Sequence, residues 1–264
     1  MLSHVTFGTN DIARAGAFYN EVLGLLGIVR QESYKAALGY ARKRDGAPWI
    51  WLMRPFDRLP ATWGNGSHLA LMAESREQVE LFHAAALAKG GRDEGAPGLR
   101  AHYAPDYYAA YVRDPDGNKL QAVHYGEGRV MAKGQGAISH VTLGSNDLER
   151  ARGFYDALLA TLGIGKLYDE PEGSAYCRPE TQKPAFSIRR PFDGRPATWG
   201  NGTHVAFLAR SRALVDGFHA KALELGAADE GAPGPRPRYG PTYYGAYLRD
   251  LDGNKLQAVC YAPE

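Results

Sequence analysis

The 264-residue chain contains the same sequence twice, and this duplication restricts its fold more than any other feature. Ser3-His4-Val5-Thr6 returns as Ser139-His140-Val141-Thr142, and residues 60–66 return as residues 196–202. The offset is 136 positions throughout (140 − 4 and 252 − 116), so the copies align without a net insertion. This period is far longer than that of solenoid repeats. Each copy is long enough to bury a core, so the sequence predicts two domains.

Charge and composition exclude several classes of protein. The net charge is +2 and the basic residues are scattered, so we expect neither a nucleic-acid partner nor an anionic membrane surface. The sequence has no long apolar run and shows no signal peptide, because His4 stands almost at its start. Both cysteines, Cys177 and Cys260, lie in the second copy. A disulfide framework is therefore not expected, and the cytoplasm is the expected location.

Within each copy the pattern predicts strand, helix and three strands, and then the same order again. In the first copy, residues 2–8 favour a strand, and Asn10 is the expected N-cap of a helix that Gly27 ends. Ser75 with Gln78 is typical of a capping box at the start of the second helix. Residues 107–113 and 119–125 predict a hairpin. The glycine-rich residues 127–136 are expected to link domains 1–126 and 137–264.

Three segments carry a resemblance to a known family. They are the Ser-His-Val-Thr start, Trp-Gly-Asn-Gly-(Ser/Thr)-His, and the ending Asp-(Pro/Leu)-Asp-Gly-Asn-Lys-Leu-Gln-Ala-Val. Together they resemble the vicinal oxygen chelate superfamily, which includes glyoxalase I, extradiol dioxygenases, fosfomycin-modifying enzymes and bleomycin-binding proteins. The resemblance covers both copies. It implies an α+β fold of two tandem glyoxalase-like domains, each with paired βαβββ modules that form a U-shaped sheet around a cleft.

The resemblance also implies candidate metal ligands in each copy. They are His4, His68 and Gln121 in the first, and His140, His204 and Gln257 in the second. Strand alternation allows the three side chains of one copy to converge on one cleft, which is our primary expectation. The alternative is that the first-strand ligand comes from the opposite copy, so that His4 joins His204 and Gln257.

The third ligand departs from the family pattern, because metal-dependent relatives usually carry Glu where this chain has Gln. Two imidazoles and one amide supply no negative charge, so we expect low occupancy by a divalent metal such as Zn, Fe, Ni or Mn. The alternative is that the histidines line the cleft as hydrogen-bonding residues without metal.

Other residues are candidates for binding a substrate. Strand alternation directs Trp49, Trp51 and Met53 to the cleft in one copy and Ala185, Ser187 and Arg189 in the other. We therefore expect one aromatic cleft wall that prefers flat ligands and one cationic wall that prefers anions.

One tyrosine from each of the pairs Tyr107-Tyr108 and Tyr243-Tyr244 should face the cleft, or both pairs should pack within the sheet. Trp63 and Trp199 either cover the pocket or anchor their loops.

These features indicate a glyoxalase/dioxygenase-like protein that acts on a small oxygenated molecule, as a metal-dependent lyase or dioxygenase. The alternative is a metal-free protein that sequesters a small molecule, as bleomycin-resistance proteins do. A third option is that one copy is active and the other is a scaffold. In each case the partner is a small-molecule ligand, and the two copies are expected to associate as a pseudo-dimer within one chain.

Overall fold

The computed structural model describes residues 1–42, 49–126, 137–181, 183 and 185–263. The expected linker, residues 127–136, lies outside the described residues. In the described part of the chain, no helix is long and apolar enough to cross a membrane.

Each copy contains two modules of one strand, one helix and three strands. In the first copy these elements are β1 (Leu2–Gly8), α1 (Ile12–Gly24), β2 (Ile28–Tyr34), β3 (Ala37–Arg42), β4 (Ile50–Met53), β5 (His68–Met72), α2 (Arg76–Ala88), β6 (Arg92–Leu99), β7 (Tyr108–Arg113) and β8 (Lys119–His124).

The second copy follows the same order with one added 3₁₀ turn. Its elements are β9 (Ile138–Gly144), α3 (Leu148–Ala160), β10 (Gly165–Glu170), β11 (Gly173–Cys177), β12 (Phe186–Arg189), β13 (His204–Leu208), α4 (Arg212–Glu224), β14 (Ala228–Pro235), η1 (Pro237–Tyr239), β15 (Tyr244–Arg249) and β16 (Lys255–Cys260).

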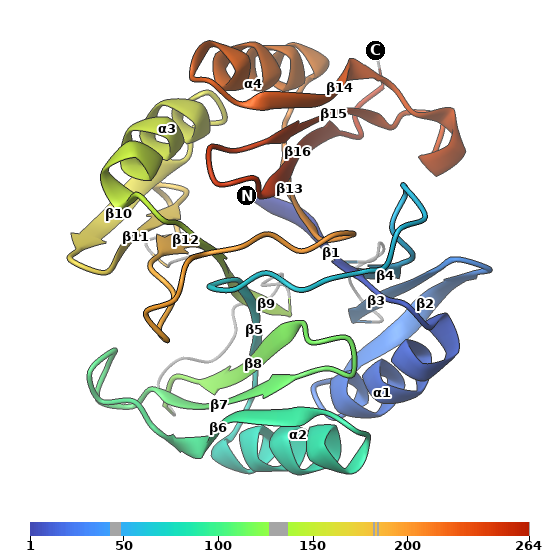
Figure 1. Cartoon of the computed structure of the whole chain (residues 1–264), viewed down its shortest axis with the longest axis vertical. Helices are drawn as coiled ribbons and strands as arrows, with labels where there is room; N and C mark the ends of the chain where they lie inside the picture. The colour runs from blue at the N-terminus through green and yellow to red at the C-terminus, as the bar shows by residue number, and fades with distance from the viewer. Residues whose placement is uncertain (43–48, 127–136, 182, 184, 264) are drawn as a thin grey trace.

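The strands form two eight-stranded sheets, and each sheet takes one module from each copy. Sheet A has the order β14-β15-β16-β13-β1-β4-β3-β2, and sheet B has the order β10-β11-β12-β9-β5-β8-β7-β6. The copies meet where β1 runs antiparallel to β13, with Val5 opposite Val205, and where β5 runs antiparallel to β9. In Figure 1 the blue elements therefore lie with the orange and red ones, and the green elements with the yellow ones.

The predicted α+β fold of tandem glyoxalase-like domains with paired βαβββ modules is confirmed. The paired modules come from opposite copies, so neither sheet is built from one copy alone.

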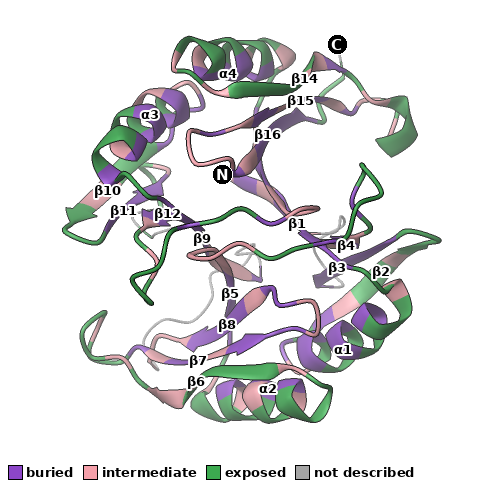
Figure 2. Ribbon diagram, in the orientation of Figure 1, coloured by how far each residue is buried: buried purple, intermediate pink, exposed green. Residues whose placement is uncertain are grey.

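The helices cover the outer faces of the sheets and bury one side of each helix. Figure 2 shows the outer faces of the four helices exposed and much of the strands buried. On α1 the buried side carries Phe18, Tyr19, Val22 and Leu23, which recur at helical spacing. The N-cap of α1 is Asp11, not the expected Asn10, since the Asp11 carboxylate accepts hydrogen bonds from the backbone N–H groups of Ala13 and Arg14.

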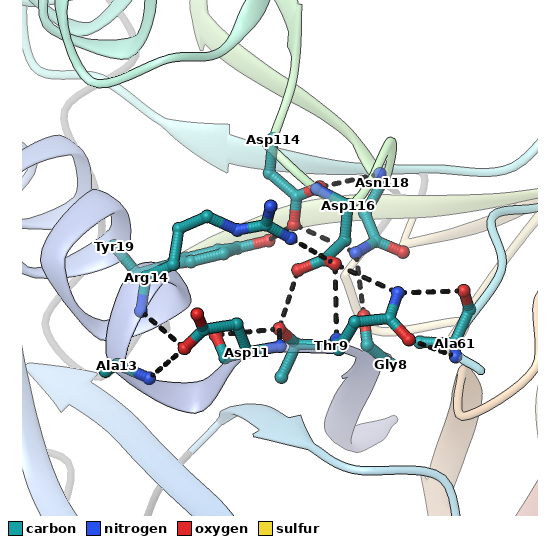
Figure 3. Close-up of polar contacts among 11 residues, drawn as sticks. Gly8, Thr9, Asp11, Ala13, Arg14, Tyr19, Ala61, Asp114, Asp116 and Asn118 are labelled. Carbon is teal, nitrogen blue, oxygen red and sulfur yellow. Dashed lines mark hydrogen bonds and ion pairs between the residues drawn. The ribbon is translucent and has the colours of Figure 1, made fainter. Parts of the chain in front are cut away.

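The turn between β7 and β8 fastens the two modules of the first copy to each other (Figure 3). The Tyr19 hydroxyl donates to Asp114 at 2.8 Å, and the Thr9 hydroxyl donates to Asp116 at 2.6 Å. The Asn118 amide donates to the carbonyl of Gly8 at 3.1 Å. The Asp-Pro-Asp-Gly-Asn segment is therefore a structural joint between sheet A and sheet B.

The loops at residues 60–66 and 196–202 join the two copies. The Asn65 amide donates to Asp193 at 3.0 Å, and the Asn201 amide donates to Asp57 at 3.1 Å. The loops approach so closely that a Cβ on Gly66, whose φ is +86°, would lie 2.7 Å from the Cα of Gly144. Only glycine suits both that contact and that φ.

Candidate functional site

Each sheet brings together two histidines and one glutamine, and the two histidines come from different copies. The ring centroids of His4 and His204 lie 5.5 Å apart in sheet A, and those of His68 and His140 lie 5.5 Å apart in sheet B. The expectation that His4, His68 and Gln121 share one cleft is wrong. The alternative holds, because β1 pairs with β13 and not with β5.

Each pair of histidines is joined by one glutamine, which lies on the strand beside β13 or beside β5. Gln257 on β16 lies opposite Ala206 on β13, and Gln121 on β8 lies opposite Ala70 on β5. Both glutamine side chains are fully buried. We call His4, His204 and Gln257 the sheet A triad, and His68, His140 and Gln121 the sheet B triad.

Burial keeps the four imidazoles neutral near pH 7. Desolvation lowers the pKa of His4 and of His140 to about 4. Desolvation also lowers the pKa of His68 well below its usual value, and His140 and Lys119 contribute to that shift. His204 behaves in the same way, with contributions from His4 and Lys255. Neutral imidazoles can accept a hydrogen bond or bind a metal ion.

Hydrogen bonds behind the triads orient their side chains. The Ser139 hydroxyl lies 3.0 Å from Nδ1 of His140, and it also contacts the hydroxyl of Tyr125 at 2.8 Å. Ser3 and His4 repeat this contact at 3.0 Å. The serine contact at Nδ1 thus fixes the orientation of the His140 and His4 rings.

The glutamine amides bind a tyrosine through nitrogen and leave their oxygens available. Gln121 donates from Nε2 to the hydroxyl of Tyr107 at 2.7 Å, and Gln257 donates to Tyr243 at 2.6 Å. Among the described residues, no hydrogen-bond partner completes Oε1 of Gln121, Oε1 of Gln257 or Nε2 of His68. Buried polar atoms are rarely unpaired, so these atoms are candidates to bind a ligand.

The tyrosine pairs divide between the cleft and the outer surface. Tyr107 and Tyr243 are buried beside the glutamines, and desolvation raises the pKa of both hydroxyls. The hydroxyl of Tyr108 instead reaches Glu80 on α2 at 2.8 Å, and that of Tyr244 reaches Asp216 on α4 at 2.8 Å. The structure thus brings Tyr107 and Tyr243, but not Tyr108 or Tyr244, to the triads.

The cavity over sheet B, which we call cleft B, measures about 270 Å³. Ser187 and Arg189 lie on its wall as expected from strand alternation. Arg189 also pairs with Glu170 on β10 at 3.0 Å. Glu170 was not predicted from the sequence, and neither were Tyr103, Tyr111 and Tyr168, which also line this cavity. Tyr125 lines it too, as expected from strand alternation with Gln121. Tyr111 could have been predicted, because it follows Tyr107 by four positions and alternation along a strand places both side chains on the same face.

The cavity over sheet A, which we call cleft A, measures about 1110 Å³ and includes His204. Met53 lines it, but Trp49 and Trp51 do not. Trp51 stacks on Tyr34 with ring centroids 6.3 Å apart, and Trp49 packs against the hydrophobic core. The prediction that Trp49 and Trp51 line this cavity is therefore wrong, because one packs against the core and the other against Tyr34.

Trp63 and Trp199 anchor their loops to the hairpin turns. The guanidinium of Arg113 lies 4.1 Å from the ring of Trp63, and that of Arg249 lies 4.2 Å from Trp199. A Cβ on Gly117 would approach the Trp63 ring to 2.3 Å, so the ring rests directly on the turn. Neither tryptophan lines cleft A or cleft B.

The donor atoms of each triad suit a divalent cation in type, but their charge favours weak binding. Imidazole nitrogen and amide oxygen both bind such cations. Nε2 of His68 and Oε1 of both glutamines have no hydrogen-bond partner among the described residues, whereas Nε2 of His204 lies 3.3 Å from the hydroxyl of Thr6. Within the described residues, no group of three or more His, Cys, Asp and Glu side chains is arranged to hold a metal ion. Because the imidazoles are uncharged near pH 7 and glutamine carries no charge, both triads are neutral. Lys119 and Arg189 add positive potential beside the sheet B triad.

Two βαβββ modules in each sheet, with histidines on neighbouring strands, define a duplicated protein of the glyoxalase-like class. The chain belongs to the Glyoxalase/Bleomycin resistance protein/Dioxygenase superfamily, which matches residues 1–122 and 137–258. No curated protein matches the sequence.

Solved structures share the fold of this chain. Glyoxalase I from Zea mays has a TM-score of 0.71 at 19% identity and covers 98% of this chain and 92% of its own. A putative dioxygenase from Bacillus subtilis subsp. subtilis str. 168 has a TM-score of 0.61 at 16% identity and covers 99% and 85%. At these identities the likeness establishes the fold. A glyoxalase/bleomycin resistance protein from Albidiferax ferrireducens T118 is 44% identical over 47% of this chain and 98% of its own, with a TM-score of 0.43.

Proposed function

We propose that this glyoxalase-like protein acts on a small oxygenated molecule in each cleft, and that each triad holds a divalent metal weakly. The observation that carries the proposal is the set of buried, unpartnered donor atoms in sheet B, Nε2 of His68 and Oε1 of Gln121, beside the neutral ring of His140. Such atoms are stabilised by an electrophile, which is either a cation or a hydrogen-bond donor of the substrate.

A metal bound there would polarise a substrate oxygen as a Lewis acid. Side chains of the protein would supply the hydrogen bonds and the proton. Tyr107 accepts a hydrogen bond from Gln121 and is itself hydrogen-bonded to Tyr111, which also lines cleft B, so these two hydroxyl groups are the ones that can donate a proton toward a substrate oxygen. Burial raises the pKa of Tyr107 and keeps that proton in place near neutral pH. The neutral imidazoles can accept a hydrogen bond from a hydroxyl group of the substrate.

The competing proposal is a metal-free binding protein. It is supported by the positive potential of Lys119 and Arg189 at the sheet B triad and by the neutrality of all three of its side chains. In that case the same atoms would accept hydrogen bonds directly from hydroxyl groups of a ligand. The tyrosines around cleft B would add aromatic contacts to the ligand.

The experiment is a calorimetric titration of Mn²⁺, Ni²⁺ and Zn²⁺ into protein that carries no affinity-tag histidines. We expect weak binding at about two sites per chain, and loss of one site each in His68→Ala and His204→Ala. Since the exposed His102 belongs to neither triad, His102→Ala is the control. No binding at millimolar metal would favour the metal-free protein. Binding that survives both triad variants would contradict the assignment of the site.

A further inference from the structure

Cleft A differs from cleft B in size and charge, although the sequences that build the two are repeats of each other. Cleft A is lined by six basic residues and two acidic ones, a balance of +4: Arg54, Arg58, Arg236, Arg238, Arg249 and Lys255 against Asp57 and Glu230. Cleft B is lined by Lys183 and Arg189 against Glu170, a balance of +1. The positive field therefore belongs to the larger cavity.

Among the described residues, four arginines of cleft A have no acidic partner: Arg54, Arg58, Arg236 and Arg238. Glu230 pairs with Arg249 at 2.6 Å and with Lys255 at 2.9 Å, so those two charges are offset. Asp57 is held by the amide of Asn201. No carboxylate in the part of the chain that the structure describes lies within ion-pair distance of these four guanidinium groups.

The backbone at Arg58 is a second, independent sign. Its φ is +63°, and it is the one non-glycine residue with positive φ among those described. L side chains rarely adopt this conformation, and the matching position of the other copy is Gly194, with φ +69°. The first copy thus makes the same turn with a less favourable residue, which places a guanidinium on the wall of cleft A.

Aromatic rings stand among these charges. Phe56 is 86% exposed, and Tyr239 is 43% exposed. The guanidinium of Arg238, from the second copy, lies 5.5 Å from the ring of Phe56 in the first copy and 4.5 Å from the ring of Tyr239. The residue of the first copy that matches Arg238 is His102, and it does not line cleft B.

We propose that cleft A binds an aromatic anion, with its carboxylate or phosphate between Arg58 and Arg238 and its ring against Phe56 and Tyr239. Guanidinium groups bind both kinds of anion through charge-assisted hydrogen bonds. Arg189, which the sequence analysis favoured as the anion-binding residue, instead has Glu170 as its partner in cleft B. This inference rests on the proposed function only in that cleft A takes a small molecule.

The test is fluorescence titration with 1-naphthyl phosphate, 1-naphthoate, 1-naphthol and inorganic phosphate. We expect both naphthyl anions to bind at one site per chain, at least ten-fold more tightly than naphthol or phosphate alone, and less tightly as salt rises. The naphthyl anion that binds more tightly shows whether the site prefers a phosphate or a carboxylate. Equal binding of naphthol and the naphthyl anions would overturn the proposal, as would the absence of binding.

Two test substitutions replace an arginine by the residue that stands at the matching position of the other copy, so that the local backbone is preserved. Arg58→Gly and Arg238→His should each weaken naphthyl anion binding about ten-fold, and Arg58→Gly should fold at least as stably as the original because it removes the unfavourable φ. Arg195→Gly removes the same charge outside both cavities and should leave the affinity unchanged.

Unchanged affinity in Arg58→Gly and Arg238→His would overturn the anion site and leave the triad proposal standing. Metal titrations of the same variants keep the two proposals separate, because loss of metal binding in His68→Ala and His204→Ala does not depend on either arginine.

Discussion

The imidazole of His4 lies edge-on to that of His204, with ring centroids 5.5 Å apart and ring planes 84° apart, and the two residues belong to different copies. His68 and His140 repeat this arrangement at the same distance and angle. Each candidate site therefore needs both halves of the chain. A change in one copy acts on a site that the other copy completes, and this decides how variants should behave in combination.

Double variants should show which histidines act together. We expect His4→Ala and His204→Ala to be non-additive in the free energy of unfolding by about 0.5–3 kcal/mol, because the rings are in contact. His4→Ala and His68→Ala lie in different sheets and should add within about 0.5 kcal/mol. Urea denaturation of the single and double variants measures both values. Non-additivity of the second pair, with additivity of the first, would contradict the strand pairing.

Gln121→Glu should raise the affinity of the sheet B triad for divalent metal. The substitution supplies the negative charge that two imidazoles and an amide lack. It also places a carboxylate where Lys119 and Arg189 contribute positive potential. We expect the metal dissociation constant to fall at least ten-fold, as measured by calorimetry. Gln121→Met is the control and should bind no more metal than the original protein. Stoichiometric, tightly held metal in the unaltered protein would contradict the reasoning.

Stability should fall as the pH is lowered from 6.5 toward 4. The folded-state pKa of His4 and of His140, about 4, lies below the value of 6.5 taken for an unperturbed histidine. The unfolded chain therefore binds more protons in this window, so the free energy of unfolding rises with pH across it. Each residue contributes roughly 1.4 kcal/mol per unit of pKa difference.

The measurement is urea denaturation at several pH values between 5 and 7. The double variant His4→Gln and His140→Gln should show a shallower dependence of the free energy of unfolding on pH. The matched control, His102→Gln, changes an exposed histidine and should keep the original slope. An unchanged slope in the double variant would show that these two histidines do not titrate as the structure indicates.

Gly66→Ala should destabilise the protein by about 2–5 kcal/mol. The new Cβ would lie 2.7 Å from the Cα of Gly144 in the other copy, on a backbone with φ +86°. Gly153 on α3 is the control, because a Cβ there meets nothing within 4 Å. Gly153→Ala should therefore stabilise the helix by about 0.5–1 kcal/mol. Thermal denaturation measures both effects, and equal melting temperatures would show that the loops do not meet as described.

Trp63→Leu should lower stability and leave metal binding unchanged. The ring stacks on Arg113 at 4.1 Å and rests on Gly117, away from both cavities. Loss of the cation–π contact should cost about 0.5–1 kcal/mol, apart from any loss of packing. Urea denaturation and metal titration of the same sample separate the two effects. A marked change in metal affinity without loss of stability would instead make Trp63 a residue of the site.

Much of the secondary structure follows from local pattern. The strands at residues 28–34 and the hairpin around Asp116-Gly117 could be predicted because alternation and turn residues act over a few positions. The Asn10 error instead has a tertiary origin. Asn10 and Asp11 are both good N-caps, and Asn10 is drawn instead to the carbonyl of Ala61 and to Asp116, which only the folded chain brings near.

The duplication, the α+β class and the family resemblance could all be recognised in the amino-acid sequence, and the resemblance pointed to the six residues of the triads. How those six residues divide between two sites depends on the folded chain, because the copies carry the same sequence at these positions and so offer equivalent partners to each strand. Local pattern cannot distinguish pairing of β1 with β5 from pairing of β1 with β13. The choice rests on contacts between distant segments, such as Asn65 with Asp193. The charge of cleft A has the same origin, since Arg58 and Arg238 belong to different copies and line one cavity only because sheet A combines modules from both.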